Sequence, residues 1–476
     1  MKKIGFAVLV MSALTSVSMS ASAQTPVLVN DQIHALGELH ALGQNLIFIG
    51  DNSALYVSDG TSAGTKLLSN IQIPLYPVPG SIAQIGQLAY FQANDGTHGN
   101  EPWVTDGTQA GTHMLADVNP GPSGSNPSQF IELNGRIFFV ANDGVHGAEL
   151  WVSDGTQAGT ELAVDIRPGQ AGSGPYGMTV FHGLLFFAAA GNGGSFAWWK
   201  SDGTPAGTIQ TGDIPPTLSI GAPFLALNDA LYFIGQDPGN FVWHTDGTTS
   251  GTYKLVNSPL TNSNLVVCAG HLYFGASDAP NGIQLWQSDG SQAGTHVLLE
   301  TTPGRSPYDI NCAGGELYFW ARSNDGFNDV WHSDGTPAGT RSITNVPVFS
   351  PPQYNANFSR FEANIFFAAR ASLDANTSSG LELWALDSSA GGAHQVADLN
   401  PGSADSSPEY FTNFRGTFFF LASKANGRFL WRIDASTPPN PPVPPNPPVP
   451  ATALGTWAHI FIFLLLAVGA WAYRRP

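Results

Sequence analysis

Residues 149–160 read ELWVSDGTQAGT, and residues 101–112 repeat them closely as EPWVTDGTQAGT. Versions of this block return every 43–53 residues along the chain. The aromatic residue of the block recurs nine times, at Tyr56, Trp103, Trp151, Trp199, Trp243, Trp286, Trp331, Trp384 and Trp431. A fixed period of this length indicates repeated structural units.

Each repeat also carries a pair of large apolar residues upstream of that aromatic, such as Phe138-Phe139 in the third repeat. Short apolar runs bounded by turn residues are typical of buried strands. In the third repeat we expect strands at Gln129–Leu133, Arg136–Ala141, Glu149–Ser153 and Glu161–Ile166, with a tight hairpin at Asn134-Gly135. Four short antiparallel strands per period predict the blades of a β-propeller.

The predicted fold is therefore all-β, a single propeller of eight or nine four-stranded blades over residues 24–436. Nine copies can be counted, but a degenerate copy packed outside an eight-bladed ring is the alternative. The ninth copy stops after Asp434 without a fourth strand, and residues 27–31 resemble the fourth strands of other copies. We therefore expect the N-terminal strand to complete the last blade and close the ring, which leaves no large exposed sheet edge.

Residues 1–23 have the features of a secretory signal peptide. Lys2 and Lys3 precede the apolar stretch 4–14, and small residues precede the predicted cleavage between Ala23 and Gln24. The apolar stretch is too short for a transmembrane helix. The sequence thus predicts export.

The other end has a proline-rich linker, residues 437–450, and a terminal segment, residues 451–476. Residues 457–473 form an uncharged apolar run that is just long enough to span a bilayer. Arg474 and Arg475 follow this run and would stay on the cytoplasmic side. A permanent anchor and a processed sorting signal both fit this pattern.

Two resemblances follow from these motifs. The repeated Trp-x-Ser/Thr-Asp-Gly-Thr-x-Ala-Gly-Thr resembles the ELWxxDGT repeat proteins of bacteria, which are exported and mostly uncharacterised. The tail, with Val449, Pro450 and Trp457 before the apolar run, resembles the IPTL type of Gram-negative sorting signal, although extra residues separate Pro450 from Leu454. The second resemblance implies transient anchoring in the inner membrane and processing by an envelope protease-transpeptidase.

Composition and missing motifs exclude several classes of function. The chain of 476 residues has a formal net charge of −17 and only 11% charged residues. Such an acidic protein repels phosphate backbones, so nucleic-acid binding is not expected. The sequence contains no zinc-protease motif, nucleophile elbow or phosphate-binding glycine loop.

The repeated aspartates are the first candidate site. They lie in Asp-Gly turns at Asp59, Asp106, Asp154, Asp202, Asp246, Asp289 and Asp334. A Ca²⁺ ion needs six to eight oxygen ligands, and each turn offers one carboxylate. We therefore interpret these residues as structural and expect no cofactor, with a ring of Ca²⁺ sites as the alternative. Weaker metal candidates are Asp95 and Asp143, because Glu101 and Glu149 follow six residues later.

The two cysteines, Cys268 and Cys312, each precede an Ala-Gly step and occupy the same position of adjacent repeats by sequence. Export makes a disulfide between two blades plausible. Equivalent atoms of neighbouring blades can also lie too far apart to bond. The sequence leaves both outcomes open.

No catalytic constellation stands out, so the favoured function is a non-enzymatic envelope protein that binds a surface glycan or a protein. A glycan-active enzyme with a loop-built site is one alternative, and a purely structural envelope component is another. The ligand is not indicated by any motif.

Overall fold

The computed structural model describes residues 24–74, 82–212, 217–218, 224–236, 239–260, 264–278, 281–299, 306–322, 328–343, 358–371, 380–387 and 392–436. The chain divides into two compact units, residues 1–434 and 435–476. The first unit is built almost entirely of antiparallel strands, and its only helical segment among the described residues is a 3-10 turn, η1 (Asp51–Ser53).

The strands fall into nine repeats, eight of four strands and one, the fifth, of five. Repeat 1 consists of β2 (Ala35–Leu42), β3 (Asn45–Gly50), β4 (Ala54–Ser58) and β5 (Lys66–Gln72). Repeat 2 consists of β6 (Ile82–Ile85), β7 (Leu88–Asn94), β8 (Asn100–Thr105) and β9 (His113–Met114). Repeat 3 consists of β10 (Ser128–Leu133), β11 (Arg136–Asn142), β12 (Ala148–Ser153) and β13 (Glu161–Val164). The third repeat agrees with its predicted strands to within two residues at each end.

Repeats 4 to 6 follow the same order. Repeat 4 consists of β14 (Tyr176–Phe181), β15 (Leu184–Ala190), β16 (Phe196–Ser201) and β17 (Ile209–Gly212). In repeat 5, β18 (Thr217–Leu218) and β19 (Leu225–Leu227) both pair with β20 (Ala230–Gln236), and β21 (Asn240–Thr245) and β22 (Tyr253–Lys254) follow. Repeat 6 consists of β23 (Val266–Cys268), β24 (His271–Asp278), β25 (Gly282–Ser288) and β26 (His296–Leu299).

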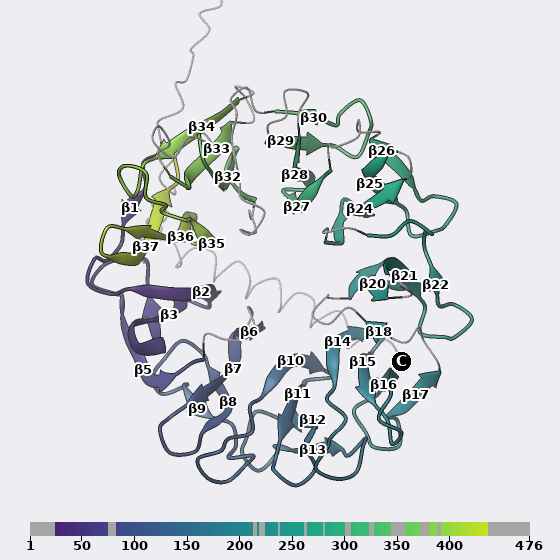
Figure 1. Cartoon of the computed structure of the whole chain (residues 1–476). Helices are drawn as coiled ribbons and strands as arrows, with labels where there is room; N and C mark the ends of the chain where they lie inside the picture. Colours follow the sequence, from purple (N-terminus) through teal and green to yellow (C-terminus); the bar gives the residue numbers. More distant parts are fainter. Residues whose placement is uncertain are drawn as a thin grey trace, which may run out of the picture. The chain divides into compact units, whose positions relative to one another are not determined.

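The last three repeats contain the N-terminal strand. Repeat 7 consists of β27 (Tyr308–Ala313), β28 (Glu316–Arg322), β29 (Asn328–Ser333) and β30 (Arg341–Ser342). Repeat 8 consists of β31 (Ser359–Phe361), β32 (Asn364–Ala369), β33 (Glu382–Asp387) and β34 (Gly392–Ala397). Repeat 9 consists of β35 (Glu409–Phe414), β36 (Thr417–Lys424), β37 (Gly427–Asp434) and the N-terminal strand β1 (Val27–Leu28). Figure 1 shows these repeats in chain order, with β1 beside β37.

The N-terminal strand completes the ninth repeat, as predicted. Val27 pairs with Arg432 and Leu28 with Trp431. The next residue, Val29, donates its backbone N–H to the carbonyl of Leu430 at 3.0 Å and is itself buried. The pairing is shorter than the predicted residues 27–31.

Apolar cores join each repeat to the next. For example, Phe138 and Leu150 of repeat 3 share a core with Leu185 and Phe187 of repeat 4. Repeat 9 packs on repeat 1 in the same manner, because Phe419 and Leu421 share a core with Leu46 and Phe48. The order of packing is therefore cyclic, although no single sheet closes on itself.

The glycine of the Asp-Gly turn lies against an aromatic ring of the preceding repeat at four internal junctions, at Gly203, Gly247, Gly290 and Gly335, and at the junction between repeats 9 and 1. A Cβ added at Gly203 would lie 2.8 Å from Cζ of Phe138 in the preceding repeat, and one added at Gly60 would lie 2.8 Å from Cζ of Phe419. Both glycines have a φ of +92°. Glycine is required here by the left-handed backbone and by the ring packed against it.

The first strand of several repeats contains a bulge that reaches the next repeat. Glu38, Gln129, Asp309 and Tyr410 have φ between 43° and 57° at points where the strand register shifts. The amide of Gln129 donates to the carbonyl of Pro175 and accepts from the N–H of Met178, both at 3.2 Å. Glu38 likewise accepts the N–H of Ile82 at 3.0 Å. These inter-repeat hydrogen bonds offset the strain of a left-handed residue.

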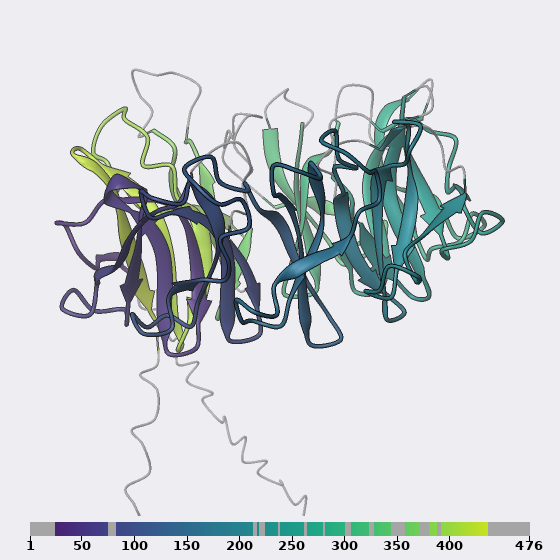
Figure 2. The ribbon, with the colours of Figure 1, turned by 90° about the horizontal axis from the view of Figure 1, so that it is seen from below.

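The antiparallel order gives every repeat two different ends. In repeat 3, the hairpin 134–135 and the Asp-Gly turn 154–159 lie at one end of the strands, which we call the turn end. The loop 143–147 and the connector 165–175 lie at the other, which we call the connector end. Seen from the side in Figure 2, the loops gather beyond the two ends of the strands.

Candidate functional site

The seven predicted turn aspartates share one geometry at the turn end. Oδ1 of Asp154 accepts the backbone N–H of Thr156 at 2.9 Å and its hydroxyl at 2.7 Å. The same hydroxyl accepts the N–H of Gly159 at 3.0 Å. A Cβ on Gly159 would overlap the Asp154 carboxylate, so the second glycine of the motif is needed for contact with the aspartate.

The hydroxyls of the residues that flank the turn form a second set of hydrogen bonds. The Ser153 and Thr160 hydroxyls lie 2.7 Å apart, and the Thr160 hydroxyl donates to the carbonyl of Thr156 at 2.7 Å. The Ser153 hydroxyl also accepts the N–H of Gly155 at 3.0 Å. This network explains each polar residue and glycine of the repeated motif by a local contact.

The hydrogen bonds also set the charge of these aspartates. Donation from the Thr156 hydroxyl and N–H lowers the pKa of Asp154, and the six equivalent aspartates have lowered pKa values for the same reason. The ionised carboxylate is thus engaged in its own turn. Among the described residues no group of three or more His, Cys, Asp or Glu side chains is arranged to hold a metal ion.

Asp95 and Asp143 lie in loops at the connector end of repeats 2 and 3. Oδ1 of Asp143 accepts the N–H groups of Val145 and His146, and Oδ2 lies 2.7 Å from Nδ1 of His146. Asp95 makes the equivalent contacts with Thr97 and His98. Hydrogen bonding to the aspartate raises the pKa of each histidine. The two carboxylates are therefore committed to their own loops, and Glu101 and Glu149 are directed elsewhere.

Glu101, Glu149 and Glu382 form a repeated site that the sequence interpretation missed. All three are fully buried, two residues before the repeat tryptophan. Glu149 accepts the N–H groups of Ile166 and Arg167 at 3.2 and 3.1 Å. It also accepts the N–H and the hydroxyl of Ser173, at 2.7 and 2.5 Å. The carboxylate thus holds both ends of the connector to the next repeat.

Glu101 and Glu382 each make three of these four contacts with their own connectors. Glu101 accepts from Val118, Asn119 and Ser125. Burial raises the pKa of all three glutamates, and that of Glu382 reaches about 7. A sequence signal for this site exists, because in each case Pro-Gly follows the glutamate after 19 residues and the serine follows after 24.

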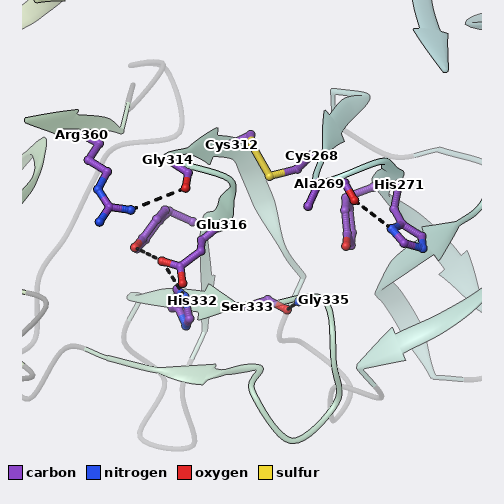
Figure 3. The surroundings of a disulfide bond; sticks show 12 residues. Cys268, Ala269, His271, Cys312, Gly314, Glu316, His332, Ser333, Gly335 and Arg360 are labelled. Carbon is purple, nitrogen blue, oxygen red and sulfur yellow. Dashed lines mark hydrogen bonds and ion pairs between the residues drawn. A yellow bond between two sulfur atoms is a disulfide. The ribbon is translucent and has the colours of Figure 1, made fainter.

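Cys268 and Cys312 are joined by a disulfide with a Cα–Cα distance of 5.5 Å (Figure 3). The sequence interpretation that placed them in the same position is wrong by one residue. Cys268 pairs with His271 at the last step of its hairpin, whereas Cys312 pairs with Leu317 one step earlier. Successive residues of a strand face opposite sides. The offset therefore lets β23 and β27 present their cysteines to each other, which identical positions would not do.

The surroundings of this disulfide contain a small polar cluster. Glu316 accepts the hydroxyl of Tyr318 at 3.1 Å, and its carboxylate lies 3.4 Å from Nε2 of His332 (Figure 3). Burial, with the nearby Glu316 charge, raises the pKa of Tyr318 well above its usual range. The cluster connects β28 and β29 within one repeat.

The remaining predicted residues lie outside the described part of the chain. They are Ala23 at the predicted cleavage site and Val449, Pro450, Trp457, Arg474 and Arg475 of the predicted sorting signal; Gln24 is described, and its side chain bonds Glu362 and Asn364. Among the described residues, no helix has the length and apolar character needed to cross a membrane. The predicted segment 457–473 is not among them.

Comparisons with known proteins give a coarse result. No family model and no curated protein matches the sequence. Among solved structures, BamB from Moraxella catarrhalis is similar over 86% of this chain and 100% of its own, with 13% identity and a TM-score of 0.38. A puromycin hydrolase is similar over 82% of this chain and 59% of its own, with 11% identity and a TM-score of 0.39.

The chain spans 52–60% of the length of the hydrolases and peptidases that it resembles. The fold is that of an all-β, propeller-like protein built mainly of four-stranded antiparallel sheets.

Proposed function

We propose that this chain is an exported, non-enzymatic binding protein of the bacterial cell envelope. Its scaffold would be a closed propeller of nine blades, and its ligand would be a surface glycan or protein bound at the connector end. Residues 1–23 and 451–476 would serve delivery, with transient anchoring in the inner membrane and release by an envelope protease-transpeptidase.

The observation that carries this proposal is the difference between the two ends. In seven of the nine repeats the turn end carries one motif, and the bond from the Thr or Ser hydroxyl to Oδ1 of the aspartate is 2.7–2.8 Å in all seven. The connector end varies, from the 3-10 turn Asp51–Ser53 to the histidine loop 143–147 and the glycine-rich loop 191–195. A constant scaffold with variable loops at one end is the usual arrangement of a binding protein.

The chemistry of the described residues favours binding over catalysis. The turn aspartates and the buried glutamates are saturated by backbone and hydroxyl donors, and His98 and His146 are bonded within their own loops. An enzyme needs titratable groups that converge on a shared concave site. These aspartates, glutamates and the two histidines instead recur in repeat positions, which supports a scaffold role.

A matched pair of substitutions tests the location of the surface. Phe196 lies at the connector end of repeat 4 and is 49% exposed, while Ile209 lies at the turn end of the same repeat and is 48% exposed. Retention is measured by incubating the purified protein with cell envelopes from bacteria that do not make this protein. We expect the double variant Phe196→Arg with Val145→Arg to bind these envelopes at least about tenfold more weakly, which corresponds to about 1.4 kcal/mol of binding free energy. Ile209→Arg, combined with Leu67→Arg, should leave retention unchanged.

Thermal unfolding of each variant verifies that all four substitutions leave the fold intact. Equal loss from both pairs, or no loss from either, would contradict a binding surface at the connector end. Release of soluble sugar fragments from the envelopes by the unmodified protein would instead favour a glycan-active enzyme.

A further inference from the structure

The chain contains four Asn-Gly pairs, and the reactivity of this dipeptide depends on the backbone around it. The pairs are Asn134-Gly135, Asn192-Gly193, Asn281-Gly282 and Asn426-Gly427. The backbone nitrogen of such a glycine can attack the side-chain carbonyl carbon of the asparagine, because glycine has no Cβ to hinder the approach and rotates freely. How fast each pair reacts in the folded protein therefore depends on how firmly the fold holds that nitrogen.

The pair Asn134-Gly135 is held at the turn end. It forms the hairpin between β10 and β11, where Leu133 pairs with Arg136. Asn134 has a φ of 54°, and a left-handed residue places the next backbone nitrogen on the opposite side of the Cα–C bond from its own Cβ. The N–H of Gly135 also donates to the Glu132 carboxylate at 2.6 Å. Attack on the Asn134 side chain would require both the turn and this hydrogen bond to break.

The pair Asn192-Gly193 lies in an open turn at the connector end. Within the loop 191–195, the N–H of Gly194 donates to the carbonyl of Gly191 at 2.8 Å, so Asn192 and Gly193 are the central residues of the turn. Both are exposed, and neither is left-handed. Within the part of the chain that the structure describes, no group accepts the N–H of Gly193 or bonds the Asn192 side chain. The attacking nitrogen and its target are therefore both unrestrained.

Strand pairing restrains the other two pairs. Gly282 pairs with Asp278 and Gly427 pairs with Lys424, so the backbone at each glycine is fixed in a ladder. The N–H of Asn281 also donates to the carbonyl of Asp278 at 2.6 Å, and its side-chain amide donates to the Asp278 carboxylate at 3.4 Å. The fold therefore leaves Asn192 the most reactive of the four asparagines.

We propose that Asn192 is a site of spontaneous deamidation, and that its hairpin protects Asn134 from the same reaction. The nitrogen of Gly193 forms a bond to Cγ of Asn192, and the side-chain nitrogen leaves as ammonia, taking up through solvent the proton that the glycine N–H loses. Water then opens the resulting five-membered ring. Aspartate forms when the new bond to Cγ breaks, and isoaspartate forms when the bond to the main-chain carbonyl carbon breaks. Water is the only co-reactant, and no group is oxidised or reduced.

Either product adds a negative charge to the loop 191–195. This loop lies at the connector end and directly precedes the exposed Phe196. Because the connector end is the proposed binding surface, a slow and irreversible change of charge there would weaken binding of an anionic ligand. The inference rests on the proposed function only for this consequence.

Peptide mass spectrometry of the folded, full-length protein, incubated in mildly alkaline buffer, follows all four asparagines in one sample. Asn192 should convert at least about tenfold faster than Asn134, because Asn134 reacts only after a hydrogen bond to a charged group has broken. Gly193→Ala should slow the conversion of Asn192 at least about tenfold, because a Cβ then hinders the nitrogen, and should leave the other sites unchanged. This alanine fits the fold, since its Cβ would meet no atom within 4 Å.

Unfolding in urea is the matched control, because it removes the turn and the Glu132 contact and leaves the dipeptides intact. Asn134 and Asn192 should then convert at similar rates. The assignment is overturned if the two convert equally fast in the folded protein, if Asn134 remains the slower one after unfolding, or if Gly193→Ala leaves the conversion of Asn192 unchanged. Retention by envelopes is not measured in this experiment, so its failure would not bear on the proposed binding surface.

Discussion

Replacing Glu149 with alanine is expected to lower the free energy of unfolding by about 3 kcal/mol. The fully buried carboxylate accepts four hydrogen bonds, from Ile166, Arg167 and the N–H and hydroxyl of Ser173. Alanine leaves these donors unpaired in a site that water does not reach. Urea unfolding followed by tryptophan fluorescence measures the loss.

The shape-conserving variant Glu149→Gln separates hydrogen bonding from packing. Glutamine keeps one acceptor oxygen, so we expect a loss of about half that of alanine. Equal and small effects of both substitutions, below about 0.5 kcal/mol, would show that the connector does not depend on this carboxylate.

Removal of the disulfide is expected to cost about 4 kcal/mol, the value that the chain-entropy model gives for a separation of 44 residues. The double variant Cys268→Ser with Cys312→Ser removes the bond without leaving a free thiol. Its urea midpoint should match that of the unmodified protein measured with a thiol reductant. A midpoint that equals that of the oxidised protein would contradict a stabilising link between repeats 6 and 7.

The repeats and their turns could be predicted because their determinants are local. The strands of repeat 3 follow from an alternation of apolar runs and turn residues, and the aspartate, threonine and glycine of the turn 154–159 bond one another within the motif. The closing strand was also predictable, since residues 27–31 resemble the missing fourth strand of the last repeat.

The buried glutamates and the cysteine register could not be predicted in the same way. The contact from Glu149 to Ser173 spans 24 residues, and only a comparison of the connectors reveals the shared spacing. The register error arose because the segment from Cys312 to the Tyr-Phe pair is one residue longer than that from Cys268. The bulges at Glu38, Gln129 and Tyr410 are determined by bonds to the next repeat, and side-chain type gives no indication of them.

The central structural claim is that repeat 9 joins repeat 1 as any repeat joins the next, and a designed disulfide tests it most directly. Phe414 pairs with Thr417 at the last step of its hairpin, as Cys268 does with His271. Ala41 pairs with Leu46 one step before the end, as Cys312 does with Leu317. Phe414 and Ala41 already share the core between these two repeats.

We therefore predict that the double variant Phe414→Cys with Ala41→Cys forms an intramolecular disulfide in addition to the native one. Mass spectrometry of the linked peptides identifies it. Leu133 occupies the same hairpin step as Phe414 but lies in repeat 3, so Leu133→Cys with Ala41→Cys should remain unlinked. A linked peptide from the first pair alone is the result expected for a closed ring of nine repeats. Free thiols at both introduced positions, in a protein whose native disulfide has formed, would contradict it.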